Sequence, residues 1–170
     1  MAAVCNRHAQ SKCGGTGPGL LYVNVALSPY LAWAGDPANG LTAGVNDGPT
    51  QDPDNDGISN LMEYVLGGIP AGAGAAELSI LPKQTLDATN LVLTFHRSDL
   101  SEADTAVVVQ WSTDLATWLD FATIGAGDAL PAVDITEDVP TAALDTVVVT
   151  IPRADHEVAG KLYGRVKATK

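Results

Sequence analysis

Four acidic side chains are spaced through one twelve-residue stretch so regularly that they fix the path of the backbone there. Asp52, Asp54 and Asp56 alternate along the chain, Gly57 follows at the sixth position, and Glu63 stands at the twelfth. Three such carboxylates converge on one point only if the chain turns sharply after them, and glycine permits that turn. Carboxylates at this spacing are the ligand pattern of a calcium-binding loop. The stretch therefore predicts a site for one Ca²⁺ ion.

The remaining positions of the loop also carry competent oxygen donors. Position seven offers the backbone carbonyl of Ile58, and position nine, which often acts through water, is Asn60. The predicted metal ligands are Asp52, Asp54, Asp56, the Ile58 carbonyl, Asn60 and Glu63. The alternative is an acidic turn without a metal, because Asp, Asn and Gly are also common turn residues. Three carboxylates within five residues repel one another without a cation, which favours the metal site. Ser59 stands where paired calcium loops carry a branched apolar residue, so this loop is predicted to act alone.

A short helix is expected on each side of the loop. Ser28 can cap the first helix and Pro29 suits its first position, so we expect a helix from 28 to about 34. The second helix covers 60–66 and ends at the glycine pair that begins with Gly67. Their apolar side chains predict that the two helices pack on each other, through Tyr30, Leu31 and Trp33 of the first and Leu61, Tyr64 and Val65 of the second.

The second half of the chain changes to short β-branched runs separated by turn residues. The expected strands cover 78–81, 90–97, 106–112, 121–124, 132–136, 146–151 and 161–168. About seven short strands with this punctuation are typical of an antiparallel β-sandwich of immunoglobulin or fibronectin type III size, with a small barrel as the alternative. The predicted fold is therefore mainly β, with a poorly defined tail over 1–27, a helix–calcium loop–helix segment over 28–70 and a β-sandwich over 77–170.

Charge and composition exclude several classes of partner. The chain has 9 basic against 20 acidic residues, a formal net charge of −11, which argues against nucleic acid and anionic membrane surfaces. No apolar run is long enough to span a bilayer. The first ten residues lack the apolar core of a signal peptide, so either the chain stays inside the cell or its signal lies elsewhere. Cys5 and Cys13 flank His8 in this tail. A local disulfide is one reading, and two thiols in a mobile tail is the favoured one.

No catalytic motif emerges from the sequence. His8, His96 and His156 lie outside any nucleophile motif, and His96 is expected to point away from the core. Acidic pairs that could serve a glycosidase lie in predicted turns, where carboxylates are usually solvated; they are Glu102 with Asp104 and Glu137 with Asp138. Trp111 is predicted to be a core residue. Trp118 is either a core residue or a platform for stacking a sugar ring. The chain is therefore predicted not to be an enzyme.

Several of these motifs together resemble a known kind of module. Ala32–Trp33, Gly40-Leu41-Thr42 and the run 52–68 resemble the thrombospondin type 3-like and dockerin-like calcium segments near the C-termini of large secreted bacterial proteins, with one loop where a dockerin has two. The runs 95–104, 109–118 and 162–166 are similar to the β-sandwich that accompanies such a segment. The resemblance implies a secreted or cell-surface accessory module. The expected function is to hold one structural Ca²⁺ that rigidifies the junction to the β-sandwich, with neighbouring domains as partners; the alternative is a carbohydrate- or surface-binding module of a larger secreted enzyme or adhesin, with polysaccharide as partner.

Overall fold

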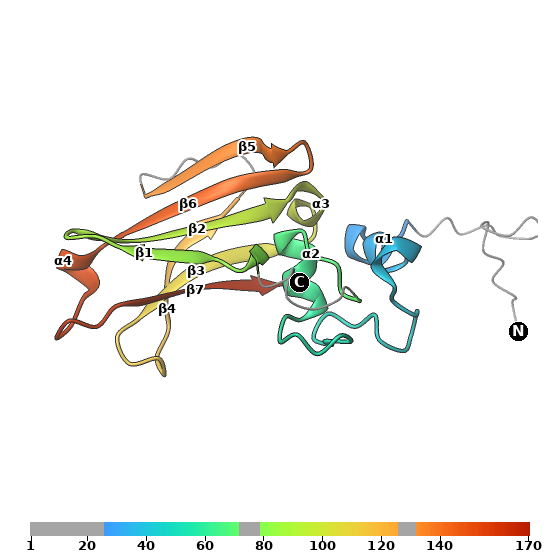
Figure 1. Cartoon of the computed structure of the whole chain (residues 1–170), viewed down its shortest axis with the longest axis horizontal. Helices are drawn as coiled ribbons and strands as arrows, with labels where there is room; N and C mark the ends of the chain where they lie inside the picture. The colour runs from blue at the N-terminus through green and yellow to red at the C-terminus, as the bar shows by residue number, and fades with distance from the viewer. Residues whose placement is uncertain (1–25, 72–78, 126–131) are drawn as a thin grey trace, which may run out of the picture.

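The computed structural model describes residues 26–71, 79–125 and 132–170, and within them the chain is mainly β with two antiparallel sheets (Figure 1). Strand alternation from residue 90 onward predicts this class, and the prediction is confirmed. The predictions for Cys5, His8 and Cys13 lie outside the described residues. No helix in the described ranges combines the length and apolar character needed to cross a membrane.

Three short helices come first in the described chain, and the strands follow with two further short helices among them. The helices are α1 (Pro29–Ala34), the 3-10 helix η1 (Pro37–Asn39), α2 (Asn60–Leu66), α3 (Asp99–Glu102) and α4 (Arg153–His156). The strands are β1 (Lys83–Leu86), β2 (Asn90–Ser98), β3 (Ala106–Ser112), β4 (Leu119–Ile124), β5 (Val133–Thr141), β6 (Leu144–Pro152) and β7 (Tyr163–Thr169). Figure 1 shows α2 and α3 at one end of the sheets, close to the C-terminal residue, and α4 at the other end.

The strands form one sheet of four and one of three. The first has the order β1-β2-β6-β5 and the second has the order β4-β3-β7, with every neighbouring pair antiparallel. The register of β2 and β6 places Leu93 opposite Val149. In the three-stranded sheet, Val109 lies opposite both Ala122 and Val166. Because side chains alternate along a strand, these registers gather the apolar side chains of each sheet on one of its faces.

One large core fills the space between the two sheets and extends into α2. Its side chains are buried residues of strands β2 to β6 together with two residues of α2: Val65, Leu66, Leu91, Leu93, Phe95, Val107, Val109, Ala122, Ile124, Val133, Val147, Val149 and Ile151. A second, smaller cluster joins the two longer helices through Tyr30, Ala34 and Tyr64, with Trp33, Leu41 and Leu61 packed against them. Helix α2 therefore contributes one face to the body of the two sheets and another face to α1.

The predicted ends of the helices hold, whereas two of the side chains predicted to pack between them do not: Leu31 is exposed (46%), and Val65 lies in the main core. The Oγ of Ser28 accepts from the backbone N–H of Leu31 (3.3 Å), so the predicted cap of α1 is confirmed. Gly67 ends α2 in the left-handed conformation (φ 79°). The conformation favours glycine, and a Cβ at this position would lie 2.5 Å from Cδ2 of Leu144, so a larger residue would also have to displace that side chain.

The strand predictions fail in two places. The strand expected at 78–81 is wrong, because residues 79–80 form a helical turn whose Ile80 packs on the core. The first strand is instead β1, whose four residues are all exposed. An exposed edge strand has no apolar alternation, so its sequence gives no strand signal. The other strands lie near their predicted positions, although β5 continues to Thr141 and β7 begins two residues late, because Lys161 forms an isolated bridge with Val158.

Candidate metal centre

The loop before α2 is shaped by its own aspartates. Oδ2 of Asp52 accepts from the N–H of Gly57 (3.0 Å), and Oδ1 of Asp56 accepts from the N–H of Ile58 (2.8 Å). A longer bond runs from the N–H of Asp56 to Oδ1 of Asp54 (3.3 Å). The tight path needs positive φ at Asn55 (61°) and Gly57 (92°). One carboxylate oxygen of each aspartate is thus used to hold the backbone turn.

The second carboxylate oxygen of each aspartate has no hydrogen-bond donor. Oδ1 of Asp52, Oδ2 of Asp54 and Oδ2 of Asp56 are buried and accept no hydrogen bond. The three side chains can each offer one oxygen such that these atoms lie within 4.8 Å of one another. Two oxygens on opposite sides of a calcium ion are about 4.6–5.2 Å apart, because each Ca–O distance is about 2.3–2.6 Å. The three carboxylates therefore have the spacing of an oxygen shell around one such cation.

The electrostatics of the loop agree with this reading. Burial, together with the neighbouring carboxylates of Asp56 and Asp52, raises the pKa of Asp54 above its ordinary value. Buried carboxylate oxygens without donors cost free energy unless a positive charge or a proton compensates them. A divalent cation at the centre of the three side chains would supply that charge.

Asn60 has a second role that the loop pattern does not predict. Its Nδ2 donates to the carbonyls of Asn46 and Gly48 (2.8 Å each), and its backbone N–H donates to the carbonyl of Gln51 (2.8 Å). Asn60 is fully buried, and its Oδ1 accepts no hydrogen bond. The side chain therefore ties the preceding segment to the start of α2 while leaving one oxygen for the metal loop.

The last two predicted ligands are placed by α2 and the turn before it. Glu63 lies in the first turn of α2 and is fully buried. The side chain of Ile58 is buried as well (4% exposed), which anchors the residue whose carbonyl stands at position seven. The structure brings Asp52, Asp54 and Asp56 together, and the roles of Ile58, Asn60 and Glu63 as ligands stay predictions.

Asp104 connects the helical segment to the rest of the molecule. Its Oδ1 accepts from the hydroxyl of Tyr64 (2.9 Å), and its Oδ2 accepts from the backbone N–H of Tyr30 (3.1 Å). The Nζ of Lys170 lies 3.4 Å from the same Oδ2. Burial raises the pKa of Tyr64, which keeps its hydroxyl protonated as a donor. The sequence pattern treats Asp104 as a solvated turn carboxylate, because its partners are 40 or more residues away along the chain.

The other acidic side chains considered for catalysis have structural contacts. Glu102 forms an ion pair with Arg97, which is nearly fully buried (2% exposed; Nη1 to Oε1 3.7 Å). The backbone N–H of Asp138 donates to Oδ1 of Asp145 (3.0 Å), a buried carboxylate on β6. Repulsion from Asp145 raises the pKa of Glu137. The first of these contacts joins α3 to β2, and the second joins β5 to β6.

The two tryptophans of the β region differ in environment. Trp111 packs against the main core and meets the ring of His156 edge-on (centroids 4.7 Å apart). The indole of Trp118 lies under the guanidinium of Arg165 (4.2 Å), and its N–H donates to the carbonyl of Leu115 (3.2 Å). One face of Trp118 and its only hydrogen-bond donor are thus already engaged, which weakens its reading as a sugar platform.

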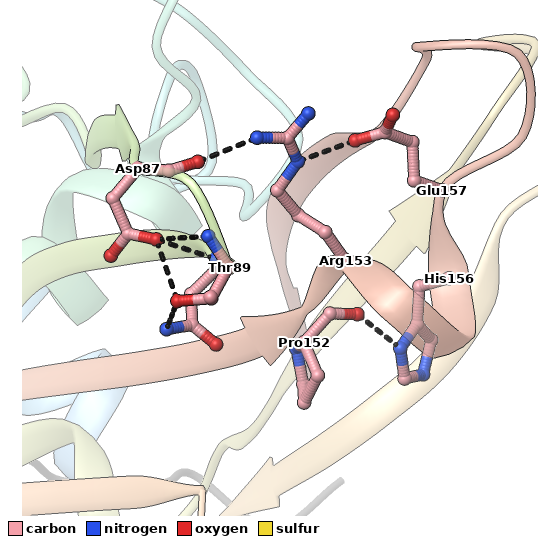
Figure 2. A network of polar contacts seen from close by, with 7 residues as sticks. Asp87, Thr89, Pro152, Arg153, His156 and Glu157 are labelled. Atoms are coloured by element: carbon pink, nitrogen blue, oxygen red, sulfur yellow. Dashed lines mark hydrogen bonds and ion pairs between the residues drawn. The ribbon is translucent and has the colours of Figure 1, made fainter.

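A shallow hollow lies beside α4, at the end of the sheets opposite to α2. Its lining residues are Ala88, Thr89, Arg153, Ala154 and Glu157. Figure 2 shows Arg153 between the carbonyl of Asp87 (2.6 Å) and the carboxylate of Glu157 (2.5 Å). The Nδ1 of His156 donates to the carbonyl of Pro152 (2.8 Å). The charged groups of this hollow pair with each other, so they fasten the turn before β2 to α4.

Comparison with models of protein families, with characterised proteins and with solved structures finds no match to the chain.

Proposed function

We propose that residues 52–63 bind one structural Ca²⁺ ion and that the chain is a non-catalytic accessory module stabilised by it. Two observations carry the proposal: Asp52, Asp54 and Asp56 each keep a buried oxygen without a hydrogen-bond donor, and the three side chains can each offer an oxygen within 4.8 Å of the others. The choice of Ca²⁺ over Mg²⁺ follows from the twelve-residue loop pattern, because Ca²⁺ takes six to eight oxygen ligands in a flexible shell whereas Mg²⁺ demands a near-ideal octahedral one. The predicted ligand set is completed by Asn60, Glu63 and the Ile58 carbonyl.

The proposed body of the module is an immunoglobulin-like β-sandwich. The order β1-β2-β6-β5 corresponds to strands A-B-E-D of an immunoglobulin domain. The order β4-β3-β7 corresponds to C′-C-F, and the hairpin β3–β4 stays within its sheet as C–C′ does. The strand order thus supports the sandwich over the barrel.

The proposed role of the ion is to rigidify the junction between the helical segment and the sheets. Helix α2 begins inside the calcium loop, and its Val65 and Leu66 lie in the main core. A cation that holds the loop would therefore fix the start of a helix that belongs to the body. Calcium is the resident ligand of secreted modules where its concentration is high, so we propose a secreted or cell-surface location.

A melting experiment tests the calcium proposal. At a free Ca²⁺ concentration about a hundredfold above Kd, binding stabilises the native state by about 2.7 kcal/mol. For a chain of this size that corresponds to a rise in Tm of about 5–10 °C over the same protein in EGTA. Glu63→Gln and Asp56→Ala should each remove most of this rise, as measured by scanning calorimetry with and without chelator.

Controls separate a specific site from general charge screening. Asp134→Ala removes an exposed carboxylate on β5 and should keep the full response. Mg²⁺ at equal concentration should give a smaller rise than Ca²⁺. A Tm that is the same in Ca²⁺ and in EGTA for the unaltered chain would refute the proposal.

The alternative function is binding of a polysaccharide or another surface by the face that carries Trp118. The row of Asp120, Gln110 and Arg165 across β4, β3 and β7 is hydrogen-bonded (2.6 and 2.8 Å) and ends in the Arg165–Trp118 stack. A glycan array would test it: binding that is lost in Trp118→Ala supports this function, and no signal across a broad array argues against it.

A further inference from the structure

Helix α1 is attached to the candidate calcium segment at two points. The ring of Tyr64, which follows the predicted ligand Glu63 directly, meets Tyr30 edge-on (5.3 Å, 88°) and also contacts Trp33 (5.1 Å). The hydroxyl of Tyr30 donates to the carbonyl of Asp47 (3.0 Å). Asp47 lies between the two carbonyls that the amide of Asn60 holds. Both contacts of α1 thus lead directly to predicted ligands.

The same helix is attached to the body of the two sheets through Asp104 and Lys170. Asp104, which follows α3, accepts from the first turn of α1 at the Tyr30 N–H. Lys170, the residue after β7, reaches both Asp104 (3.4 Å) and the Oγ of Ser28 (3.2 Å), and its Nζ lies over the ring of Tyr30 (4.0 Å). A six-residue helix is too short to be stable by itself. Its order therefore depends on these contacts.

We propose that α1 is a latch controlled by calcium: the ion keeps Tyr64 in place, Tyr64 and Lys170 keep Asp104 directed at α1, and loss of the ion releases α1 from the two sheets. This inference rests on the proposed calcium site and specifies what the ion regulates.

The coupling has a direct physical route. Without a cation, the carboxylates of the loop repel one another. The first turn of α2 then loses the ion that is proposed to hold it. Tyr64 lies in the following turn, and its hydroxyl contacts both Asp104 and the Leu100 carbonyl. A shift of this side chain removes one hydrogen-bond donor from Asp104 and two ring contacts from α1. The body itself keeps most of its core, because eleven of its thirteen buried side chains come from the strands and only Val65 and Leu66 come from α2.

Hydrogen–deuterium exchange of the whole chain tests the latch. In Ca²⁺, amides of residues 30–35 should be protected by their bonds to Asp104, Ser28 and Leu31. EGTA should speed their exchange by about tenfold, the factor expected for losing one charge-assisted hydrogen bond. Peptides covering 91–97 of β2 should not change.

Asp104→Ala supplies the reciprocal measurement. If calcium favours docking of α1 tenfold, loss of docking must weaken calcium binding by the same factor. Calorimetric titration should therefore give a Kd about tenfold higher for Asp104→Ala, and exchange of residues 30–35 should be fast even in Ca²⁺. Asp99→Ala removes an equal charge from the exposed start of α3 and should behave like the unaltered chain.

Tyr64→Phe serves if Asp104→Ala does not fold, because it keeps the ring and removes only the hydroxyl, with its contacts to Asp104 and to the Leu100 carbonyl. It should speed the exchange of residues 30–35 in Ca²⁺ and raise the Kd for calcium, each by less than Asp104→Ala does. Equal protection of residues 30–35 in Ca²⁺ and EGTA, in a chain that binds calcium, would overturn the latch and leave the calcium site standing. Unchanged calcium affinity in both variants would also overturn it. A chain that binds no calcium would instead refute the proposed function.

Discussion

Two parts of the molecule use aspartates to shape a tight backbone turn, with opposite electrostatic results. In the turn after β3, Oδ1 of Asp114 accepts from the N–H groups of Thr117 (2.7 Å) and Ala116 (2.9 Å), which lower its pKa to about 2. In the loop before α2, burial raises the pKa of Asp54, and its N–H donor is farther away (3.3 Å). The same residue type is stabilised as an anion in one place and destabilised in the other.

The difference lies in what remains after the turn has formed. The Asp114 turn is complete, because its backbone donors reach one exposed carboxylate from several sides. The loop 52–63 is incomplete, because each of Asp52, Asp54 and Asp56 retains a buried oxygen with no donor. Spare buried oxygens on three neighbouring carboxylates, rather than acidity or turn geometry, therefore distinguish a candidate metal site from an ordinary aspartate turn.

The largest expected effect comes from removing one aspartate from each region. In Ca²⁺, Asp54→Ala should lower Tm by about 5–10 °C, because the stabilisation by bound calcium is lost. In EGTA, the same change should leave Tm unchanged or raise it, because one of three repelling carboxylates is gone. Asp114→Ala should lower Tm by a few degrees equally in both conditions, because its donors lose their acceptor. Scanning calorimetry of both variants measures all four values.

The sign in EGTA decides this test, and Asp134→Ala again controls for the loss of one charge. If Asp54→Ala destabilised the chain equally with and without calcium, the loop would be an ordinary turn like that of Asp114. The distinction drawn from the spare oxygens would then be wrong.

The sequence predicts the acidic residues of the candidate site better than the contacts that link this site to distant parts of the chain. Asp52, Asp54 and Asp56 come together because a local spacing rule places them, and local rules are readable in a sequence. Asn60 is predicted as a ligand, yet its amide group holds the carbonyls of residues 46 and 48, which only the folded chain brings near. Asp104 is missed, because its partners come from α1, α2 and the end of β7.

The same division between local and distant information applies to the fold. Leu91, Leu93 and Phe95 alternate visibly, so β2 is predicted almost in full. Strand β1 is missed because all its side chains are exposed and only pairing with β2 makes it a strand. The packing of Val65 and Leu66 into the main core is missed as well, because their helical spacing says which side chains share a face but not what covers them.

An intermediate effect is expected from pH. In EGTA, the raised pKa of Asp54 means that the folded chain binds this proton more tightly than the unfolded chain does. Its contribution to stability is therefore complete below the ordinary value of 3.8 and is lost as pH rises through the raised pKa. In Ca²⁺, protons compete with the ion, so acid weakens the stabilisation. The difference in Tm between Ca²⁺ and EGTA should thus shrink steadily as pH falls from 7 towards 4.

The Asp114 turn should respond to acid with the opposite sign and at lower pH. Its stabilisation is complete above 3.8 and is lost as pH falls through about 2, with and without calcium. Groups common to both conditions cancel in the difference, including Glu102 and Glu137, whose pKa values are also raised. A Tm difference that is constant between pH 7 and pH 4 would contradict the assignment of Asp54 to the site.

The smallest expected effect concerns one residue in each region that adopts the left-handed conformation. Asn55 in the loop (φ 61°) tolerates it, whereas Leu115 in the turn (φ 62°) is a strained and exposed leucine. Leu115→Asn should raise Tm by about 1–3 °C in Ca²⁺ and EGTA alike. Asn55→Leu should lower Tm more in Ca²⁺ than in EGTA, because only the bound ion requires the whole loop to keep its path. Equal losses in the two conditions would mean that the turn at Asn55 forms independently of the metal, as the turn at Leu115 does.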